Sequence, residues 1–357
     1  MKDKILDALR NVDDPDLKKD IVTLGMVQDL TITGNKVYFR LVLTTPACPM
    51  KDMIMNACKN AIHHLVDKNL EVEIKADAIV TQQSRSNKQM MQGIKNIIAV
   101  ASGKGGVGKS TVATNLAIAL AARGAKTGLL DADIYGPSLP AMLGLRGKKP
   151  DVKRQGEKVI IVPYEQYGIK AMSVGLLIDE KQALVWRGPM ITSALRQLML
   201  DVDWGELDYL VIDMPPGTGD IYLTVSQQFP LSAAVIVTTP QYVAVADARK
   251  SIEMFRTPTI NIPILGIIEN MSWFSPAELP DNKYYIFGHG GGKDLAEEYN
   301  IPLLAQLPLF QSVAGDADGG KPAILNENSG IRKYFEEMAD NTAQQIAILN
   351  AKEVVAA

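Results

Sequence analysis

The 357-residue sequence has little cysteine, few aromatic residues and almost no net charge. Its two cysteines, Cys48 and Cys58, provide no disulfide framework in a chain of this length, and free thiols suit a reducing compartment. A formal net charge of −3 gives no reason to expect binding to nucleic acid or to an acidic membrane. No run of about 18 apolar residues occurs, so we expect no membrane-spanning helix.

The remaining composition is that of an ordinary globular protein, with 47% hydrophobic and 22% charged residues. The opening segment, MKDKILDALRNVDDPD, is charged throughout and lacks the apolar core of a signal peptide. We therefore expect a cytoplasmic protein, and the length suffices for about two domains.

Residues 1–82 carry the pattern of a small α+β domain. Apolar residues at helical spacing near the start predict a helix (Ile5, Leu6, Leu9 and Val12). A β-branched strand, a second helix and a short strand follow, in the segments KVYFRLVLTT, MKDMIMNACKNAIHHLV and EVEIKADAIV. Residues 83–96 are polar and poor in large aliphatic side chains, which predicts a linker.

Residues 97–357 alternate apolar strands with helical segments. The predicted strands are nearly continuous apolar runs, as expected for strands buried on both faces: NIIAVAS, KTGLLDAD, YLVIDMPPG, AAVIVTT and ILGIIEN. This alternation predicts an α/β domain built on a doubly wound, mainly parallel sheet.

The segment VASGKGGVGKST (residues 100–111) follows the first of these strands and leads into a helix. It contains the phosphate-binding pattern G-x-x-x-x-G-K-[ST]. Glycines let backbone N–H groups converge on phosphate oxygens, and the helix N-terminus favours the anion. In such loops the lysine contacts the β- and γ-phosphates of ATP, and the hydroxyl ligates Mg²⁺. We expect the nucleotide to be bound by Gly103, Lys104, Gly105, Gly106, Val107, Gly108, Lys109, Ser110 and Thr111.

Aspartates end two of the predicted strands. Asp131 and Asp133 close KTGLLDAD, and Asp213 closes YLVID. Carboxylates at the carboxyl ends of parallel strands face the ligand crevice. We expect Asp213 to hold Mg²⁺ through water, and Asp131 or Asp133 to orient the attacking water, although either can instead cap a helix. The segment PPGTG (residues 215–219) is a predicted sensor of the γ-phosphate.

The phosphate loop carries a second lysine, Lys104, directly after its first glycine. Lys109 already serves the phosphates from within the loop, and Lys104 is poorly placed to reach the same γ-phosphate. We expect Lys104 to reach the nucleotide of a second subunit, as an arginine finger does, which predicts a homodimer and a catalytic role for Lys104 beside Lys109 and Asp133. A solvated surface lysine is the alternative.

The motifs of the second domain resemble those of a known family. KGGVGKST is similar to the deviant Walker A sequence of the family that contains MinD, ArsA and the nitrogenase iron protein. DADIYGPS, WRGPM (residues 186–190), DMPPGTGD and ENMSWF resemble its Mrp/ApbC branch of iron–sulfur cluster carrier ATPases, over residues 97–325. This resemblance implies that Asp133 positions water, that Asp131 lies nearer the Mg²⁺ shell, that Asn270 contacts adenine, and that Pro308 and Asp316 lie near the base.

Residues 1–82 resemble the small iron–sulfur assembly domain that precedes the ATPase in many Mrp-type proteins, through VDDPDLKKDIVTLGMV and LTTPACPMKDMI. Cys48 stands where that domain keeps a reactive cysteine. Its position between two prolines, before a helix, favours a thiolate. A half-buried, unreactive cysteine is the alternative, and Cys58, within the helix, is expected to be core.

The usual cluster site of Mrp-type carriers is missing. A C-x-x-C pair generally follows ENMS, but this chain has no cysteine after Cys58. Iron–sulfur clusters need soft thiolate ligands. Three alternatives follow: Cys48 holds the cluster, with the Cys48 of a second subunit; the protein assists assembly without holding metal; or it handles another cargo.

We interpret the chain as a dimeric MgATPase of iron–sulfur cluster assembly or transfer, acting on iron–sulfur scaffold or recipient apoproteins. A scaffold that binds ATP without turnover and a MinD-like positioning ATPase are the alternatives. The C-terminal segment AQQIAILNAKEVVAA has few basic residues, which disfavours the membrane helix that the latter needs.

Overall fold

The computed structural model describes residues 1–46, 48–78, 91, 93–156, 158–178, 188–276, 278–279, 281–327 and 330–356. The chain forms two compact units, Met1–Gln82 with Ala343–Ala357, and Gln83–Thr342. The first strand of the second unit begins at Ile94, inside the segment expected to be a linker. None of the described helices combines the length and the apolar character needed to cross a bilayer.

The first unit is an α+β fold around a three-stranded sheet of order β3-β4-β5. Strands β3 and β4 form an antiparallel hairpin, whereas β4 and β5 are parallel because α2 connects them as a crossover helix. Side chains from α1, α2 and β4 form its core (Ile5, Leu9, Phe39, Leu41, Ile54, Cys58 and Ile62). The elements are α1 (Lys2–Leu9), β1 (Asp13–Asp14), β2 (Lys19–Asp20), β3 (Val27–Thr33), β4 (Lys36–Leu43), α2 (Lys51–Leu65) and β5 (Glu71–Ala78).

The second unit is built on an eight-stranded sheet of order β10-β11-β7-β12-β6-β13-β14-β15. Only the edge pair β10–β11 is antiparallel, which confirms the doubly wound, mainly parallel sheet. The strands are β6 (Ile94–Ala101), β7 (Thr127–Asp131), β10 (Tyr164–Gln166), β11 (Ile169–Ser173), β12 (Leu207–Asp213), β13 (Ala233–Thr238), β14 (Ile264–Phe274) and β15 (Leu303–Leu309). A separate antiparallel hairpin joins β8 (Val152–Gln155) to β9 (Lys158–Ile161).

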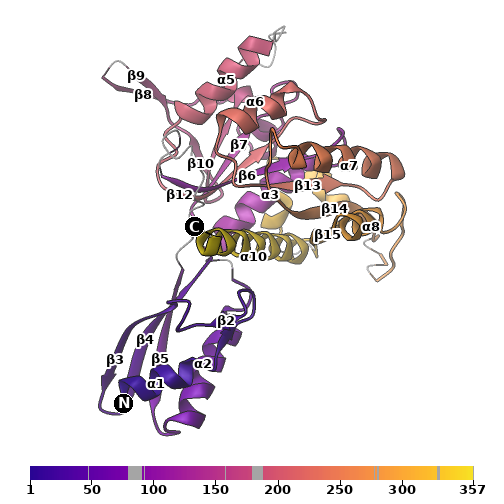
Figure 1. Ribbon diagram of the computed structural model, residues 1–357. Helices are drawn as coiled ribbons and strands as arrows, with labels where there is room; N and C mark the ends of the chain where they lie inside the picture. The colour runs from indigo at the N-terminus through magenta and orange to yellow at the C-terminus, as the bar shows by residue number, and fades with distance from the viewer. Residues whose placement is uncertain are drawn as a thin grey trace. The chain divides into compact units, whose positions relative to one another are not determined.

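Helices cover both faces of this sheet (Figure 1). From β6 the chain crosses through α3 to β7 on one side, whereas the later crossovers run through α7 and α8 toward β14 and β15 on the other side. Because such crossovers are right-handed, α3 lies on the opposite face from α7 and α8. The helical elements are α3 (Lys109–Ala122), α4 (Leu139–Met142), η1 (Val174–Leu176), α5 (Gly188–Leu200), α6 (Asp220–Gln228), α7 (Tyr242–Arg256), α8 (Gly291–Tyr299), α9 (Gln311–Asp318), η2 (Ala323–Leu325) and α10 (Arg332–Ala356).

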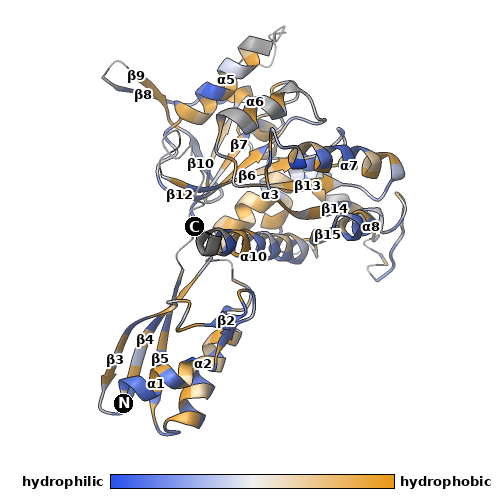
Figure 2. Cartoon of the chain, in the orientation of Figure 1, coloured by the Kyte–Doolittle hydropathy of each residue, from blue (hydrophilic) through white to orange (hydrophobic). Residues whose placement is uncertain are grey.

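The core of the second unit centres on β6 and α3. Every residue of β13 is buried, as are the residues of β6 from Asn96 to Ala101. Helix α3 is hydrophobic around most of its circumference (Figure 2), as expected for a helix buried on all sides. Strand order reverses at β6, so the carboxyl end of β6 is the point where open α/β sheets bind their ligands.

Candidate nucleotide-binding site

The loop between β6 and α3 has the backbone conformation of a phosphate cradle. Gly106 (φ 84°) and Gly108 (φ 79°) adopt left-handed conformations that disfavour other residues. The Ser102 hydroxyl donates a hydrogen bond to the Lys104 carbonyl oxygen (3.0 Å), which fixes the start of the loop. Helix α3 begins at Lys109, and the first amides of a helix lack intrahelical acceptors and attract anions.

A cavity of about 480 Å³ opens above this loop, a volume within the range of small-molecule sites. Its lining includes both loop lysines and residues from six other segments: the turn after β7, α4, the loop after β12, β14, β15 and α9. The residues are Ser102, Lys104, Gly105, Gly106, Gly108, Lys109, Ser110, Thr111, Asp133, Ser138, Ala141, Met142, Pro216, Met271, Leu309, Val313, Ala317 and Asp318. Most of the predicted phosphate-binding residues therefore meet at one cavity.

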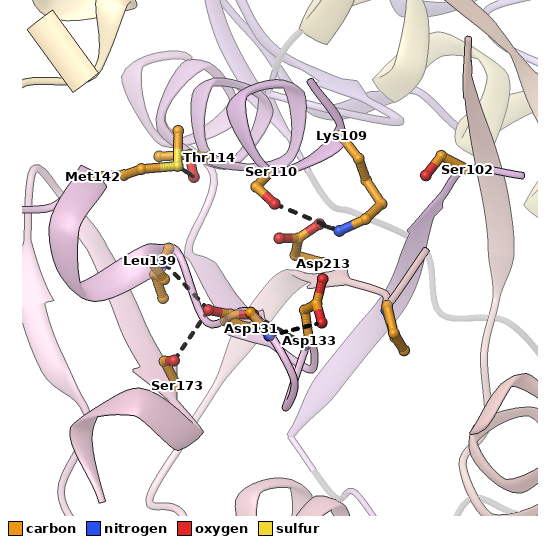
Figure 3. Close-up of polar contacts among 12 residues, drawn as sticks. Ser102, Lys109, Ser110, Thr114, Asp131, Asp133, Leu139, Met142, Ser173 and Asp213 are labelled. Carbon is orange, nitrogen blue, oxygen red and sulfur yellow. Dashed lines mark hydrogen bonds and ion pairs between the residues drawn. The ribbon is translucent and has the colours of Figure 1, made fainter. Parts of the chain in front are cut away.

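A buried ion pair lies at the floor of the site. The Lys109 ammonium contacts the Asp213 carboxylate and lies 3.5 Å from the Ser110 hydroxyl oxygen (Figure 3). The side chains of Lys109 and Asp213 are only 6% and 4% exposed. Removing one partner of a buried pair typically costs about 3–5 kcal/mol, because the other charge is left unpaired. Phosphate oxygens that enter the cavity would offer Lys109 a second anionic partner.

Asp131 lies beside Asp213 on the neighbouring strand, but its carboxylate does not line the cavity. One carboxylate oxygen accepts from the Asp133 amide (3.0 Å), and the other accepts from the Leu139 amide (3.2 Å) and the Ser173 hydroxyl (3.0 Å; Figure 3). These donors occupy both oxygens of a fully buried side chain. The arrangement favours a role in holding the turn after β7, rather than the direct Mg²⁺ contact that the resemblance implies.

Burial, together with the nearby Asp213 carboxylate, raises the pKa of Asp131 to about 7. Asp133 differs, because its side chain lines the cavity and accepts one long hydrogen bond, from the Gly136 amide at 3.3 Å. The two aspartates that the sequence left as alternatives therefore differ in position: Asp133 lines the cavity, whereas Asp131 does not.

The loop that follows β12 is held by three hydrogen bonds. The Gly217 amide donates to the Ser102 carbonyl (2.9 Å), and the Met214 amide donates to the Val100 carbonyl (3.0 Å). The buried Tyr222 hydroxyl donates to the Pro215 carbonyl (2.6 Å). The Tyr222 ring also packs edge-to-face on Phe255 of α7, with centroids 5.9 Å apart. Sequence analysis did not identify Tyr222, because no local pattern shows which carbonyl a helical tyrosine reaches.

A second cavity, of about 890 Å³, borders the other side of the same loop. It shares Asp133 and Pro216 with the first cavity, and its lining includes Tyr222 and the α5 residues Ile191 and Leu195. The loop 214–219 thus separates two cavities, so a change in either one acts on the same backbone.

The resemblance implies that Asn270, Pro308 and Asp316 lie at or near the adenine base. In the structure, these residues do not line the cavity. The Asn270 side-chain amide donates to the Val107 carbonyl (2.9 Å), so Asn270 supports the phosphate loop. Gly108 is required there, since a Cβ would lie 2.2 Å from the Asn270 nitrogen. Pro308 and Asp316 do not line the cavity, and Asp316 accepts a hydrogen bond from Asn326 (3.1 Å). Their chain neighbours Leu309 and Ala317 line it instead.

Gly103 packs against the backbone of α7, where a Cβ would lie 2.1 Å from the Asp247 carbonyl oxygen. This close approach explains a glycine at the first position of the loop, which does not itself line the cavity. Of the segment WRGPM, residues 186 and 187 lie outside the described residues.

The two cysteines differ in their surroundings. Cys58 is fully buried in the core of the first unit, and burial raises the pKa of its thiol to about 12, which disfavours metal-binding thiolate. Cys48 is half-buried in the loop between β4 and α2. Among the described residues, no three His, Cys, Asp or Glu side chains gather closely enough to hold a metal ion. One copy of the chain therefore offers no ready four-thiolate cluster site.

Comparisons with known proteins match this architecture. The family model described as "NUBPL iron-transfer P-loop NTPase" matches residues 93–343, and the model "Iron-sulfur cluster assembly protein" matches residues 2–74. The chain belongs to the NUBPL iron-transfer P-loop NTPase family. It is accordingly a nucleotide-binding member of the iron–sulfur cluster carrier and assembly proteins.

Individual relatives agree over nearly the whole length. The chain is 47% identical to the iron–sulfur cluster carrier protein of Synechocystis sp., covering 97% of this chain and 98% of that protein. It is 43% identical to the protein of the same name from Deinococcus radiodurans, covering 99% and 98%. Among solved structures, a nucleotide-binding protein from Archaeoglobus fulgidus in complex with ADP is 38% identical, with a TM-score of 0.58 over 68% of this chain and 93% of that chain.

We predict that Tyr222→Phe loosens the loop after β12. The change removes one buried hydrogen bond and leaves the Pro215 carbonyl without its donor, which should lower the free energy of unfolding by about 1–2 kcal/mol. Hydrogen exchange of the Gly217 amide should accelerate, as read by mass spectrometry. Tyr135→Phe, which alters an exposed tyrosine, is the control and should change neither quantity. Equal protection of Gly217 in both variants would contradict the proposed anchor.

We also predict a pH dependence of stability that originates at Asp131. Its pKa is near 7 in the folded protein and near 3.8 when unfolded, so the unfolded state binds fewer protons between these values. The contribution of Asp131 to stability should therefore fall as pH rises from about 4 to about 7. Asp131→Asn should show a weaker decline than the parent in urea titrations of nucleotide-free protein across this range. If the free energy of unfolding of both proteins declined equally with pH, the assignment of this pH dependence to Asp131 would be wrong.

Proposed function

We propose that this protein hydrolyses ATP with Mg²⁺, and that turnover in a homodimer drives the handling of an iron–sulfur cluster as cargo. The observation that carries the proposal is the shared cavity in which Lys104, Lys109, Ser110 and Asp133 meet, directly above the Lys109–Asp213 pair. These groups supply a cation for the phosphates, oxygen ligands for a metal and a carboxylate for the attacking water.

The site fits Mg²⁺ by the chemistry of its donors. Ser110 lines the cavity, the Asp213 carboxylate lies behind it in contact with Lys109, and Mg²⁺ prefers such oxygen ligands. When bound, Mg²⁺ neutralises charge on the β- and γ-phosphates. The chain's own residues do the rest: the loop amides and Lys109 hold the phosphates, and Asp133 accepts a hydrogen bond from the nucleophilic water.

The position of Lys104 supports the proposal of a homodimer. Its side chain lines the cavity and is only half-buried, and its ammonium forms no ion pair within the described ranges. A cation placed at the mouth of a phosphate site, and not used by its own chain, suits a second copy facing that mouth. In the transition state this ammonium would stabilise the charge on the transferring phosphoryl group of the other subunit.

The cargo follows from the relatives' names and from the chemistry of the cysteines. The Synechocystis and Deinococcus relatives are named iron–sulfur cluster carrier proteins. We propose that this chain exchanges clusters with iron–sulfur scaffolds and recipient apoproteins, and that two copies contribute one Cys48 each to the transient site. Assembly assistance without bound metal is the second candidate, favoured by the absence of a metal-binding cluster of side chains among the described residues.

A complementation experiment tests the shared active site. Lys104→Ala and Asp133→Asn should each bind ATP but lower the turnover number at least about a hundredfold. When the two variants form a mixed dimer, the site of the Lys104→Ala subunit keeps its own Asp133 and receives Lys104 from the Asp133→Asn subunit. The other site lacks both groups. Equal mixtures should recover about a quarter of the parent rate, because half of the dimers carry one complete site of two. Lys109→Ala, mixed in the same way with Asp133→Asn, is a control that lacks ATP binding in one subunit.

Failure of the mixture to recover any activity would show that Lys104 acts within its own subunit. A parent protein that binds ATP without releasing phosphate would instead contradict hydrolysis itself.

We predict that cluster binding depends on Cys48 and not on Cys58. After anaerobic reconstitution with iron and sulfide, Cys48→Ser should lose the visible absorbance of the cluster, because serine is a hard ligand. Cys58→Ala is the matched control and should retain it, since that thiol is buried and protonated. Full absorbance in the Cys48 variant would remove the thiol from the cargo site and favour the assembly-partner candidate.

A further inference from the structure

The hairpin β8–β9 and the segment leading to it carry an unusual concentration of positive charge. Residues 146–161, here called the basic arm, contain six basic and two acidic residues, a net charge of +4 in a chain whose total is −3. The basic residues are Arg146, Lys148, Lys149, Lys153, Arg154 and Lys158. The hairpin projects from the body of its unit (Figure 1).

The charges of the basic arm do not stabilise the arm itself. In the hairpin register, Lys153 and Arg154 lie opposite Ile160 and Val159, so no cross-strand charge pair forms. On the strands of the hairpin, Lys153 lies 4.0 Å from the carboxylate of Asp203, and both side chains are more than half exposed. Exposed pairs of this kind contribute about 0–1 kcal/mol. Like charges on a small hairpin repel one another, and an anionic partner would relieve that repulsion.

A cavity of about 560 Å³, with a surface that is partly apolar and partly polar, lies at the base of the basic arm. Lys153, Arg154 and Asp203 contribute charged side chains to its lining, and the apolar lining residues are Met91, Ile94, Ile160, Met199, Leu200, Val202 and Trp204. The Trp204 indole N–H donates to the Leu198 carbonyl (3.3 Å), so its polar atom is already satisfied. The arm also exposes Val152 (62%) and Val159 (52%) beside this cavity.

The base of the basic arm is firmly connected to the cavity wall. The Ile161 amide donates to the Asp201 carbonyl (2.7 Å), and the Asp203 amide donates to the Ile161 carbonyl (2.9 Å). These hydrogen bonds fix the position of the hairpin's cations relative to the cavity, as a preformed binding surface requires.

We propose that the basic arm and this cavity form a docking surface for an acidic segment of a partner protein. Carboxylates of the segment face Lys148, Lys149, Arg154 and Lys158, and one of its apolar side chains enters the cavity. The proposal names the chemistry of a partner and goes beyond the proposed function, because docking requires neither ATP hydrolysis nor a bound cluster.

The composition of the basic arm distinguishes a protein partner from other anions. No aromatic residue occurs between residues 146 and 161, whereas single-stranded nucleic acid is bound by stacking on aromatic rings. The sequence of residues 155–158, Gln-Gly-Glu-Lys, contains no apolar residue that could insert into a membrane. A cavity lined by both apolar and cationic side chains suits a peptide, which offers both carboxylates and an aliphatic or aromatic anchor.

The test uses the full chain without nucleotide, so its outcome is independent of hydrolysis. The probe is a fluorescein-labelled peptide of glutamates with a central Leu-Phe pair, followed by anisotropy. Arg154→Glu with Lys158→Glu should weaken binding at least about tenfold, and added salt should weaken the parent, because rim charges act through screened electrostatics. The matched control, Lys68→Glu with Lys75→Glu, makes the same change in net charge at exposed sites of the first unit and should bind as the parent does.

Changing the probe tests the cavity without any risk to folding. A peptide in which serines replace the Leu-Phe pair should bind at least about tenfold more weakly, because the apolar contact is lost. Equal binding of both peptides, or parent-like binding by the Arg154→Glu, Lys158→Glu variant, would overturn the proposal. So would preferential binding of duplex DNA, of oligo-dT, or of phosphatidylserine vesicles that depends on the same two residues.

Discussion

The buried contact between Lys109 and Asp213 is the interaction on which the rest of the site depends. It joins the first residue of α3 to the last residue of β12, and so links the phosphate loop to the neighbouring strand. Two charges this deeply buried are stable only as a pair. The cavity above them therefore offers a nucleotide a cation that is already positioned and desolvated. In the proposed function, Asp213 would bind the metal once phosphate has taken its place beside the lysine.

Backbone hydrogen bonds extend this connection outward from the pair. Ser102 accepts from the Gly217 amide through its carbonyl and donates to the Lys104 carbonyl through its hydroxyl, so one residue contacts both loops that surround the phosphates. Tyr222 ties the second loop to α6 and α7. Changes at the phosphates can reach the larger cavity beside α5 through these contacts, which gives a nucleotide-dependent protein a physical means of changing its outer surface.

The sequence was sufficient to predict the doubly wound sheet and the glycine loop that lines the cavity, because apolar runs and glycine spacing are local signals. It was not sufficient where a side chain's partner lies far along the chain. Asn270 contacts Val107, and Asp131 contacts Ser173, only because parallel strands bring distant segments into register. The hairpin β8–β9 was also missed, because each strand is only four residues long and neither sequence, VKRQ or KVII, alternates polar and apolar residues.

A crystal structure with Mg²⁺ and a non-hydrolysable ATP analogue tests the central claim most directly. We predict that the triphosphate occupies the cavity between Lys104 and Asp133, that the Lys109 ammonium leaves Asp213 for phosphate oxygens, and that Asp213 then faces the metal. A nucleotide bound elsewhere, or a Lys109–Asp213 contact that persists unchanged beneath the bound triphosphate, would contradict the account.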